Sequence, residues 1–263
     1  MLYDWPRATA FGRVIPKNKI YEHAGAGTAL KDLFVREVDQ IVWAHKLAPE
    51  TINLPASKSV SEIQVFHVSQ RESSLDLEAL RAIDRAIPFP LLFELTHNGR
   101  VKFAAAYKRP SEADSSKWVL GDYFEGEWQP EDAPRMPLPV ALSMGALYEL
   151  LLSPLVERQA VKLLSNPASG FAEDPQSPFA VPRSDGPLSL EARIAHAEAV
   201  KAKTREIERI KTRLARERQF NKRVAINAEL RAATQELERL LNARAASAPS
   251  KDQENDNGQA EDA

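Results

Sequence analysis

The 263-residue chain contains no cysteine. Without cysteine, it forms no disulfide, has no thiolate ligand for zinc and has no cysteine nucleophile. Histidine does not fill the gap, because the five histidines stand apart without the short spacings typical of metal ligands. They are His23, His45, His67, His97 and His196. We therefore expect no metal and no cofactor on these residue types.

Two familiar catalytic signatures are also missing. Gly25 and Gly27 are not followed by Gly-Lys-Ser or Gly-Lys-Thr, so they do not form a phosphate-binding loop of the nucleotide-hydrolase type. No Gly-x-Ser-x-Gly motif is present, which excludes the nucleophile elbow of many hydrolases. The sequence therefore identifies no reaction, and it favours a non-enzymatic role.

Long apolar runs are absent as well. The N-terminal MLYDWPRATAFGR lacks the charged-then-apolar pattern of a signal peptide, and no run approaches the roughly 20 residues that span a bilayer. Acidic and basic residues nearly balance, at 37 and 35, for a formal net charge of -2. We expect a cytoplasmic protein with no membrane partner.

Hydrophobic periodicity indicates the fold class. Apolar residues recur at helical spacing after Thr28, and again from Leu77 to Ile87 before Pro88. Asn98-Gly99 joins two β-rich runs, LLFELTH and RVKFAAAYKR, and this pair supplies the positive φ angles of a tight hairpin turn. Further β-rich runs are IVWAHKL, SEIQVFHVSQ and WVLGDYFEGEW. The pattern predicts an α+β domain with a largely antiparallel sheet and flanking helices, followed by a C-terminal coiled-coil helical arm.

Proline and charge mark the expected boundaries. After Pro130 to Pro139, SMGALYELLLSPLVERQAVKLL is typical of two short helices joined at Ser153-Pro154. Five prolines between positions 166 and 187 then indicate an extended linker, and the acid-rich C-terminus predicts disorder. We predict an α+β domain over 1–165, a Pro-rich linker over 166–187, a coiled-coil arm over 188–244 and a disordered acidic tail over 245–263.

The basic run from Lys201 to Arg223 is the strongest functional signal. It holds ten Lys or Arg against three Glu, a local charge of +7. Such a surplus favours a polyanion or an acidic partner, although a plain solvated helix surface is the simpler alternative. The residues that we expect to bind nucleic acid or a partner are Arg209, Arg213, Arg216, Arg218, Lys222 and Arg223.

The same region carries an apolar seam at heptad spacing. Its members are Ile207, Ile210, Leu214, Ile226, Leu230 and Leu237. The frame shifts between Leu214 and Ile226, which fits either a stutter in one helix or a helical hairpin. Because no Gly or Pro marks a turn there, we favour one long helix. A lone helix would leave this apolar seam exposed to solvent, so we expect a homo-oligomer or a coiled-coil partner protein.

One constellation favours an enzyme. The order of elements around Asp39 and the Glu62-Ile63-Gln64 tripeptide is similar to that of restriction-like nucleases, in which an Asp and a Glu-x-Lys bind Mg²⁺. Gln64 stands where that family has lysine, and Lys46 or Lys102 would have to substitute for it. Glu62 and Gln64 also fit the exposed positions of a half-buried strand. A divergent magnesium nuclease is therefore the alternative function, and only this alternative needs a metal.

Several segments together resemble the DUF4391 family, a bacterial and archaeal domain of unknown function. They are IPKNKIYE, KLAPETINL, EIQVFHV, LLFEL and, most specifically, ERQFNKRVAINAELRAATQELERL. The similarity runs over most of residues 10 to 243. It implies an accessory component of restriction-like or phage-defence loci, with helicase or DNA methyltransferase subunits as possible partners. We therefore expect an accessory subunit whose basic arm binds a DNA-processing partner, or DNA or RNA itself.

Overall fold

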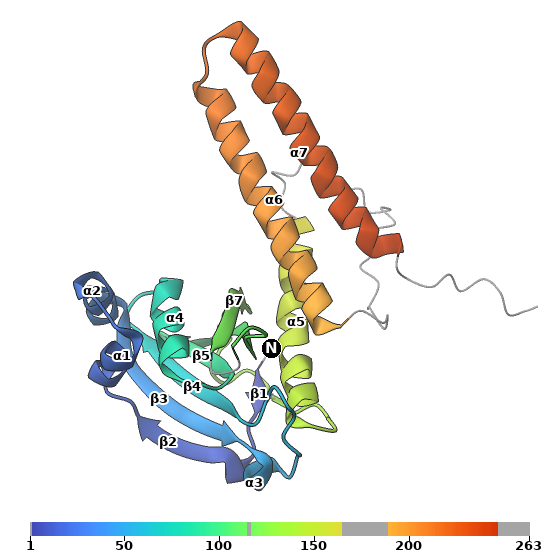
Figure 1. The fold of residues 1–263 in the computed structure, drawn as a ribbon. Coiled ribbons are helices and arrows are strands. Elements are labelled where there is room, and N and C mark those ends of the chain that lie inside the picture. Colours follow the sequence, from blue (N-terminus) through green and yellow to red (C-terminus); the bar gives the residue numbers. More distant parts are fainter. Residues whose placement is uncertain (1, 115–116, 165–188, 247–263) are drawn as a thin grey trace, which may run out of the picture. The chain divides into compact units, whose positions relative to one another are not determined.

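The computed structural model describes residues 2–114, 117–164 and 189–246 (Figure 1). The chain divides into two units, the first spanning Met1–Gln159 and the second beginning at Ala160, and each is described by itself. The predicted linker over 166–187 lies outside the described residues, as do residues 247–263 of the tail predicted over 245–263, whereas its first two residues belong to a helix. The predicted domain boundary at 165 stays a prediction. None of the described helices is long and apolar enough to cross a membrane.

The first unit combines a mixed sheet with helices. Its elements are β1 (Tyr3–Asp4), η1 (Arg7–Thr9), β2 (Ala10–Val14), α1 (Lys17–Ala24), α2 (Thr28–Glu37), β3 (Val38–Leu47), α3 (Pro49–Ile52), β4 (Ile63–Gln70), α4 (Leu77–Ala86), β5 (Leu91–His97), β6 (Arg100–Pro110), β7 (Trp118–Glu125), β8 (Gln129–Pro130), β9 (Met136–Pro137) and most of α5 (Met144–Leu164). The main sheet has the order β2-β3-β4-β5-β6-β7, with β8 on β6. Only β4 and β5 pair in parallel among these strands, so the predicted α+β class with a largely antiparallel sheet is confirmed.

Local sequence signals explain several of these elements. Asn98 and Gly99 take positive φ angles of 47° and 69° in the β5–β6 turn, as the hairpin prediction requires. Asp76 caps α4, its side chain accepting a hydrogen bond from the Glu78 N–H at 3.0 Å. The crossover through α4 then makes β5 parallel to β4.

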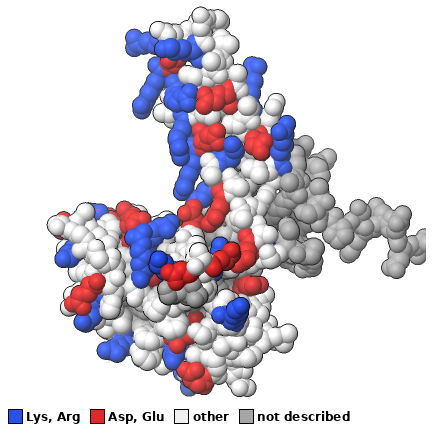
Figure 2. Space-filling model, viewed as in Figure 1, with Lys and Arg blue, Asp and Glu red and all other residues white. Residues whose placement is uncertain are grey.

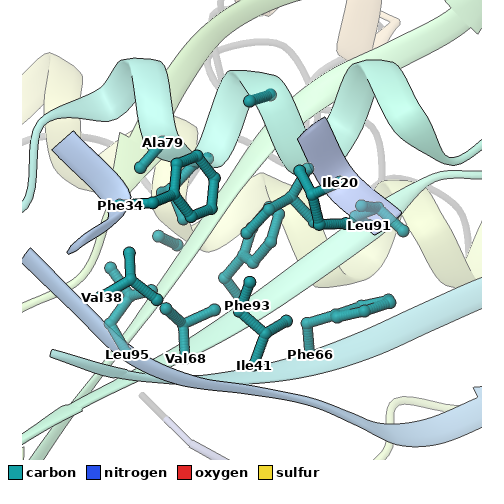
Figure 3. Close-up of a cluster of buried hydrophobic side chains, with 14 of the residues drawn as sticks. Ile20, Phe34, Val38, Ile41, Phe66, Val68, Ala79, Leu91, Phe93 and Leu95 are labelled. Atoms are coloured by element: carbon teal, nitrogen blue, oxygen red, sulfur yellow. The ribbon is translucent and has the colours of Figure 1, made fainter. Parts of the chain in front are cut away.

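The core lies between one face of the sheet and helices α1, α2 and α4 (Figure 3). Ile20, Phe34 and Ala79 point from the helices toward Phe66 and Phe93 of the sheet, and all five side chains are buried. The opposite face of the sheet packs against the N-terminal segment and the first part of α5. There, Tyr3 lies 5.6 Å from Phe103 between ring centroids, and Tyr148 stacks on Tyr107.

The expectation of two short helices around Ser153-Pro154 is wrong. The structure has one helix, α5, with Pro154 inside it. An internal proline removes a backbone hydrogen bond and costs a helix about 3 kcal/mol. Buried apolar residues on both sides of Pro154 outweigh that local cost: Met144, Leu147, Tyr148, Leu151, Leu152, Leu155 and Val156.

Candidate functional site

The C-terminal arm is a helical hairpin of α6 (Leu190–Arg216) and α7 (Phe220–Ala246). The expectation of one long helix is therefore wrong. At Glu217 the backbone leaves the helix, with φ -78° and ψ 128°, and the Glu217 side chain accepts a hydrogen bond from the Gln219 N–H at 2.8 Å. This hydrogen bond also lowers the pKa of Glu217. Side-chain capping thus makes the bend without glycine or proline.

The predicted seam lines the inside of this hairpin. Ile207 and Ile210 of α6 and Ile226 and Leu237 of α7 are buried in one hydrophobic cluster, with Leu214 and Leu230 packed against it. Each helix covers the apolar stripe of the other, and this burial stabilises the antiparallel pair. The seam is therefore buried within one chain and does not require a second one. Coiled-coil geometry and self-association stay predictions.

The positive charge of the arm is concentrated where the two helices meet. Residues 209–223, which we call the hairpin tip, carry seven Lys or Arg and a single acid, Glu217, for a net charge of +6. Residues 190–208 carry four of each sign, and residues 224–241 carry three acids and two bases. Figure 2 shows basic side chains around the end of the hairpin and mixed signs along the helices. The predicted binding residues all lie in the hairpin tip: Arg209, Arg213, Arg216, Arg218, Lys222 and Arg223.

Most of these cations are exposed and without an ionic partner. Two of the seven cations in the hairpin tip are paired: Lys211 with Glu208 at 2.9 Å, and Arg213, whose guanidinium holds both carboxylate oxygens of Glu229, at 3.2 Å and 2.9 Å. No carboxylate of the described residues lies within 4.0 Å of Arg209, Arg216 or Arg223. Unpaired arginines keep all five N–H donors of the guanidinium for a ligand. The geometry therefore leaves the hairpin tip ready for anions.

Helix electrostatics do not explain all of these cations. Arg213 and Arg216 stand at the C-terminal end of α6, where the helix dipole favours positive charge. Lys222 and Arg223 stand in the first turn of α7, where the dipole disfavours it, and that turn contains no acidic residue. Negatively charged side chains at these two positions would stabilise α7 more. The helix dipole therefore does not account for the cations at these two positions.

A second group of charged residues is buried in the first unit, around Glu94 on β5. Glu94 is 1 % exposed. Its carboxylate accepts hydrogen bonds from Trp5 Nε1 at 2.7 Å and from both terminal nitrogens of Arg135, at 2.7 Å and 3.0 Å. The Nε2 atom of His67, opposite Glu94 on the neighbouring strand β4, lies 3.2 Å from Oε2. These residues, the Glu94 cluster, attach the N-terminal segment and the loop around Arg135 to the sheet.

Two residues in or beside the Glu94 cluster, Glu94 and His45, have shifted pKa values. Burial alone would raise the pKa of Glu94, but the hydrogen bonds from His67, Arg135 and Trp5 outweigh burial and lower it to about 2. Burial lowers the pKa of His45 to about 4, and the nearby His67 adds to this effect. His45 lies 2.9 Å from the Thr9 hydroxyl through its Nδ1 atom. A carboxylate so fully satisfied is suited to holding structure rather than to moving protons.

A third group joins α4 to the sheet. Lys108 Nζ donates to the backbone oxygens of Asp84 and Ile87, both at 2.5 Å, and pairs with the Asp84 carboxylate at 3.5 Å. The Tyr123 hydroxyl donates to the same carboxylate. Burial raises the pKa of Asp84 to about 6 and lowers that of Lys108, while their ion pair opposes both shifts. All three side chains are buried, and their contacts hold α4 on the sheet.

The structure does not bring the predicted nuclease residues into one site. Asp39 lies at the start of β3, where its carboxylate pairs with Arg71 at 3.0 Å. Glu62 precedes β4 at the other end of the β3–β4 ladder, roughly 20 Å away at the rise of a strand. Glu62 contacts Gln64 at 2.5 Å and Lys46 at 3.3 Å.

Lys46, one of the two lysines that could replace the lysine of the restriction-like nucleases, is thus near Glu62, whereas Asp39 is not. Lys102 pairs instead with Glu125. Among the described residues, no three histidines or carboxylates form a group that could hold a metal ion. This arrangement gives the nuclease alternative no assembled site.

Sequence reasoning missed the Glu94 cluster, although one signal was available. Glu94 is the only charged residue in the apolar strand LLFELTH, and a charge within a buried strand requires partners. Those partners come from positions 5, 67 and 135, which no local pattern connects.

Comparison with known proteins gives one match. A family model described as "Domain of unknown function (DUF4391)" matches residues 3–237, which confirms the resemblance over nearly the whole chain. No curated protein and no solved structure matches the chain.

Proposed function

Because the chain belongs to the DUF4391 family, whose description names no activity, we propose a function from the chain's own charge and geometry. We propose that it is an accessory nucleic-acid-binding subunit whose hairpin tip contacts backbone phosphates. One observation carries the proposal: a net charge of +6 over residues 209–223, with most of its cations exposed and unpaired. Such a focused field attracts polyanions and accelerates their association.

Phosphate fits this surface better than a carboxylate-bearing small molecule does. Arginine donates two parallel hydrogen bonds to a phosphate group, and five of the seven cations in the hairpin tip are arginines. The cations come from the end of one helix, a short linker and the start of the next, so they spread over several helical turns. A phosphate backbone presents its charges over a comparable length, whereas a small anion meets only one or two of them.

The test compares two triple variants of equal charge change. Arg216, Arg218 and Arg223 are replaced by Gln in the first, and Arg205, Arg231 and Arg239, which lie on the same hairpin outside the tip, are replaced in the control. Fluorescence anisotropy with labelled DNA and RNA at two salt concentrations measures binding. Because each lost phosphate contact lowers the slope of log K against log salt by about one unit, the tip variant should lose about three units.

The control separates a specific surface from general attraction. It should keep nearly all of the affinity and slope of the natural protein, since its arginines lie where acids balance bases. Equal losses in both variants would show that only total charge matters. If the natural protein binds neither DNA nor RNA in a salt-sensitive way, the proposal fails, and an acidic protein surface becomes the ligand to seek. A helicase or DNA methyltransferase partner, a phage-defence role and a cytoplasmic location stay predictions from the sequence.

A further inference from the structure

Phe220 is the most exposed aromatic side chain among the residues that the structure describes, at 77 %. It is the first residue of α7 and lies between Arg218 on one side and Lys222 and Arg223 on the other. Val224, one turn further along α7, is 54 % exposed. Apolar side chains this exposed lose the free energy that burial would provide.

The fold itself does not use Phe220. The hydrophobic cluster of the hairpin begins on α7 at Ile226, and neither Phe220 nor Val224 belongs to it. Residues 220 and 224 are four apart and therefore share one face of α7, and Arg223, three residues after Phe220, lies next to the ring's face of the helix. The hairpin tip thus presents an exposed aromatic ring within a run of cations.

Three kinds of ligand could cover this ring, and they differ in what they offer it. A stable protein interface takes roughly 800 Å² of accessible surface from each side and has an apolar centre, whereas this face of α7 offers the two apolar side chains of Phe220 and Val224. A DNA duplex offers phosphates, but its bases are already stacked on one another. A single strand offers both a phosphate backbone and unpaired bases, whose flat faces stack on aromatic side chains.

We infer that the hairpin tip selects single-stranded nucleic acid, with Phe220 stacking on an unpaired base while Lys222 and Arg223 contact the neighbouring phosphates. The inference rests on the proposed function and adds its substrate class. Arginine beside the ring contributes to the same preference, because a guanidinium also stacks on bases. Since every base has a flat face, the preference is for single strands and not for a particular sequence.

The test measures the affinity of four full-length proteins for two probes, an oligothymidylate and a duplex of equal length. Phe220→Ala should weaken binding to the single strand by roughly 5- to 150-fold, the range observed for loss of one stacked base, and change duplex binding less than twofold. Phe220→Trp keeps an aromatic face and should restore single-strand binding. Val224→Ala removes apolar surface without removing a ring and should leave both affinities nearly unchanged.

Each other outcome decides against stacking. If Phe220→Ala weakens binding to both probes equally, Phe220 maintains the shape of the tip and does not stack on a base. If Val224→Ala has as large an effect as Phe220→Ala, the contact is a simple apolar one. No effect of Phe220→Ala overturns the inference but leaves the proposed function standing, provided that the tip arginine variant still loses binding. If the natural protein binds neither probe, both proposals fall. Circular dichroism confirms that the variants fold, as expected for exposed positions.

Discussion

The Glu94 cluster and the hairpin tip place charge in opposite ways. Around Glu94, one carboxylate is buried at 1 % exposure, receives hydrogen bonds from Trp5 and Arg135 and contacts His67, so that three segments distant in sequence meet there. In the hairpin tip, one acid accompanies seven cations, and most of these reach solvent unpaired. Burying a charge demands that its partners be fixed, so the first arrangement stabilises one fold. Leaving charges exposed costs the fold little and keeps them available for a ligand.

The largest effect that separates the two regions is expected for Glu94→Ala. This change leaves the Trp5 N–H without its acceptor and the Arg135 guanidinium with only the Tyr3 backbone oxygen, and removing one member of a buried pair costs about 3–5 kcal/mol. For a domain of this size, the melting temperature should fall by about 6–20 °C. Thermal denaturation followed by circular dichroism measures it.

The matched control for Glu94→Ala is Glu112→Ala. Glu112 also pairs with an arginine, Arg109, at 3.3 Å, but its side chain is 91 % exposed. Its loss should leave the melting temperature nearly unchanged, since exposed pairs contribute little. Similar losses in both variants would mean that burial does not give the Glu94 cluster its structural role.

A loss of stability of intermediate size is expected when His45 is protonated at low pH. Its folded-state pKa, about 4, lies below the ordinary value of 6.5, so the folded state binds the proton less well than the unfolded state does. The stability from a neutral His45 is therefore complete above pH 6.5 and is lost as the pH falls from 6.5 to about 4. After allowance for a half-buried ring, the loss is no more than about 2 kcal/mol.

His45→Gln should remove this loss, so its melting temperature should depend less on pH between 6.5 and 4 than that of the natural protein. Asp84, whose pKa is raised to about 6, acts in the opposite direction, but its contribution is common to both proteins and cancels in the difference. Glu94 loses its contribution mainly below its ordinary pKa of 4.5. Parallel pH profiles of the two proteins would contradict a buried neutral His45.

The smallest effect on stability is expected in the hairpin tip. Gln at positions 216, 218 and 223 preserves helix propensity and breaks no ion pair of the described residues. The melting temperature should stay within about 2 °C, and the helical signal at low temperature should be unchanged. A clear stabilisation would show repulsion among the cations, and a clear loss would show that they support the hairpin after all.

What the sequence could predict depended on the range of the interactions involved. The Asn98-Gly99 turn and the helix capped by Asp76 follow from neighbouring residues, and both were predictable. The hairpin bend was missed because Glu217 makes it through its own side chain, whereas glycine or proline would have marked it. The shift of the apolar frame between Leu214 and Ile226 was the only signal, and it fitted a stutter equally well.

The candidate binding residues could be identified from charge alone, but their concentration in one tip could not. A linear run of cations becomes a focused patch only after the chain reverses at Glu217. The separation of Asp39 from Glu62 was equally hidden, because it depends on which end of an antiparallel ladder each residue occupies. The parallel pairing of β4 with β5 depends on the crossover of α4, which no local pattern specifies.

The pairing of β1 with β9 sets an order of events during synthesis. Tyr3 lies opposite Met136, and Arg135 donates to the Tyr3 backbone oxygen at 2.9 Å while holding Glu94. At about 5–20 residues per second, a ribosome needs roughly 7–30 s to make the chain between these partners. Tyr3 thus cannot pair until Met136 has been made, and Glu94 stays without its guanidinium until Arg135 has been made.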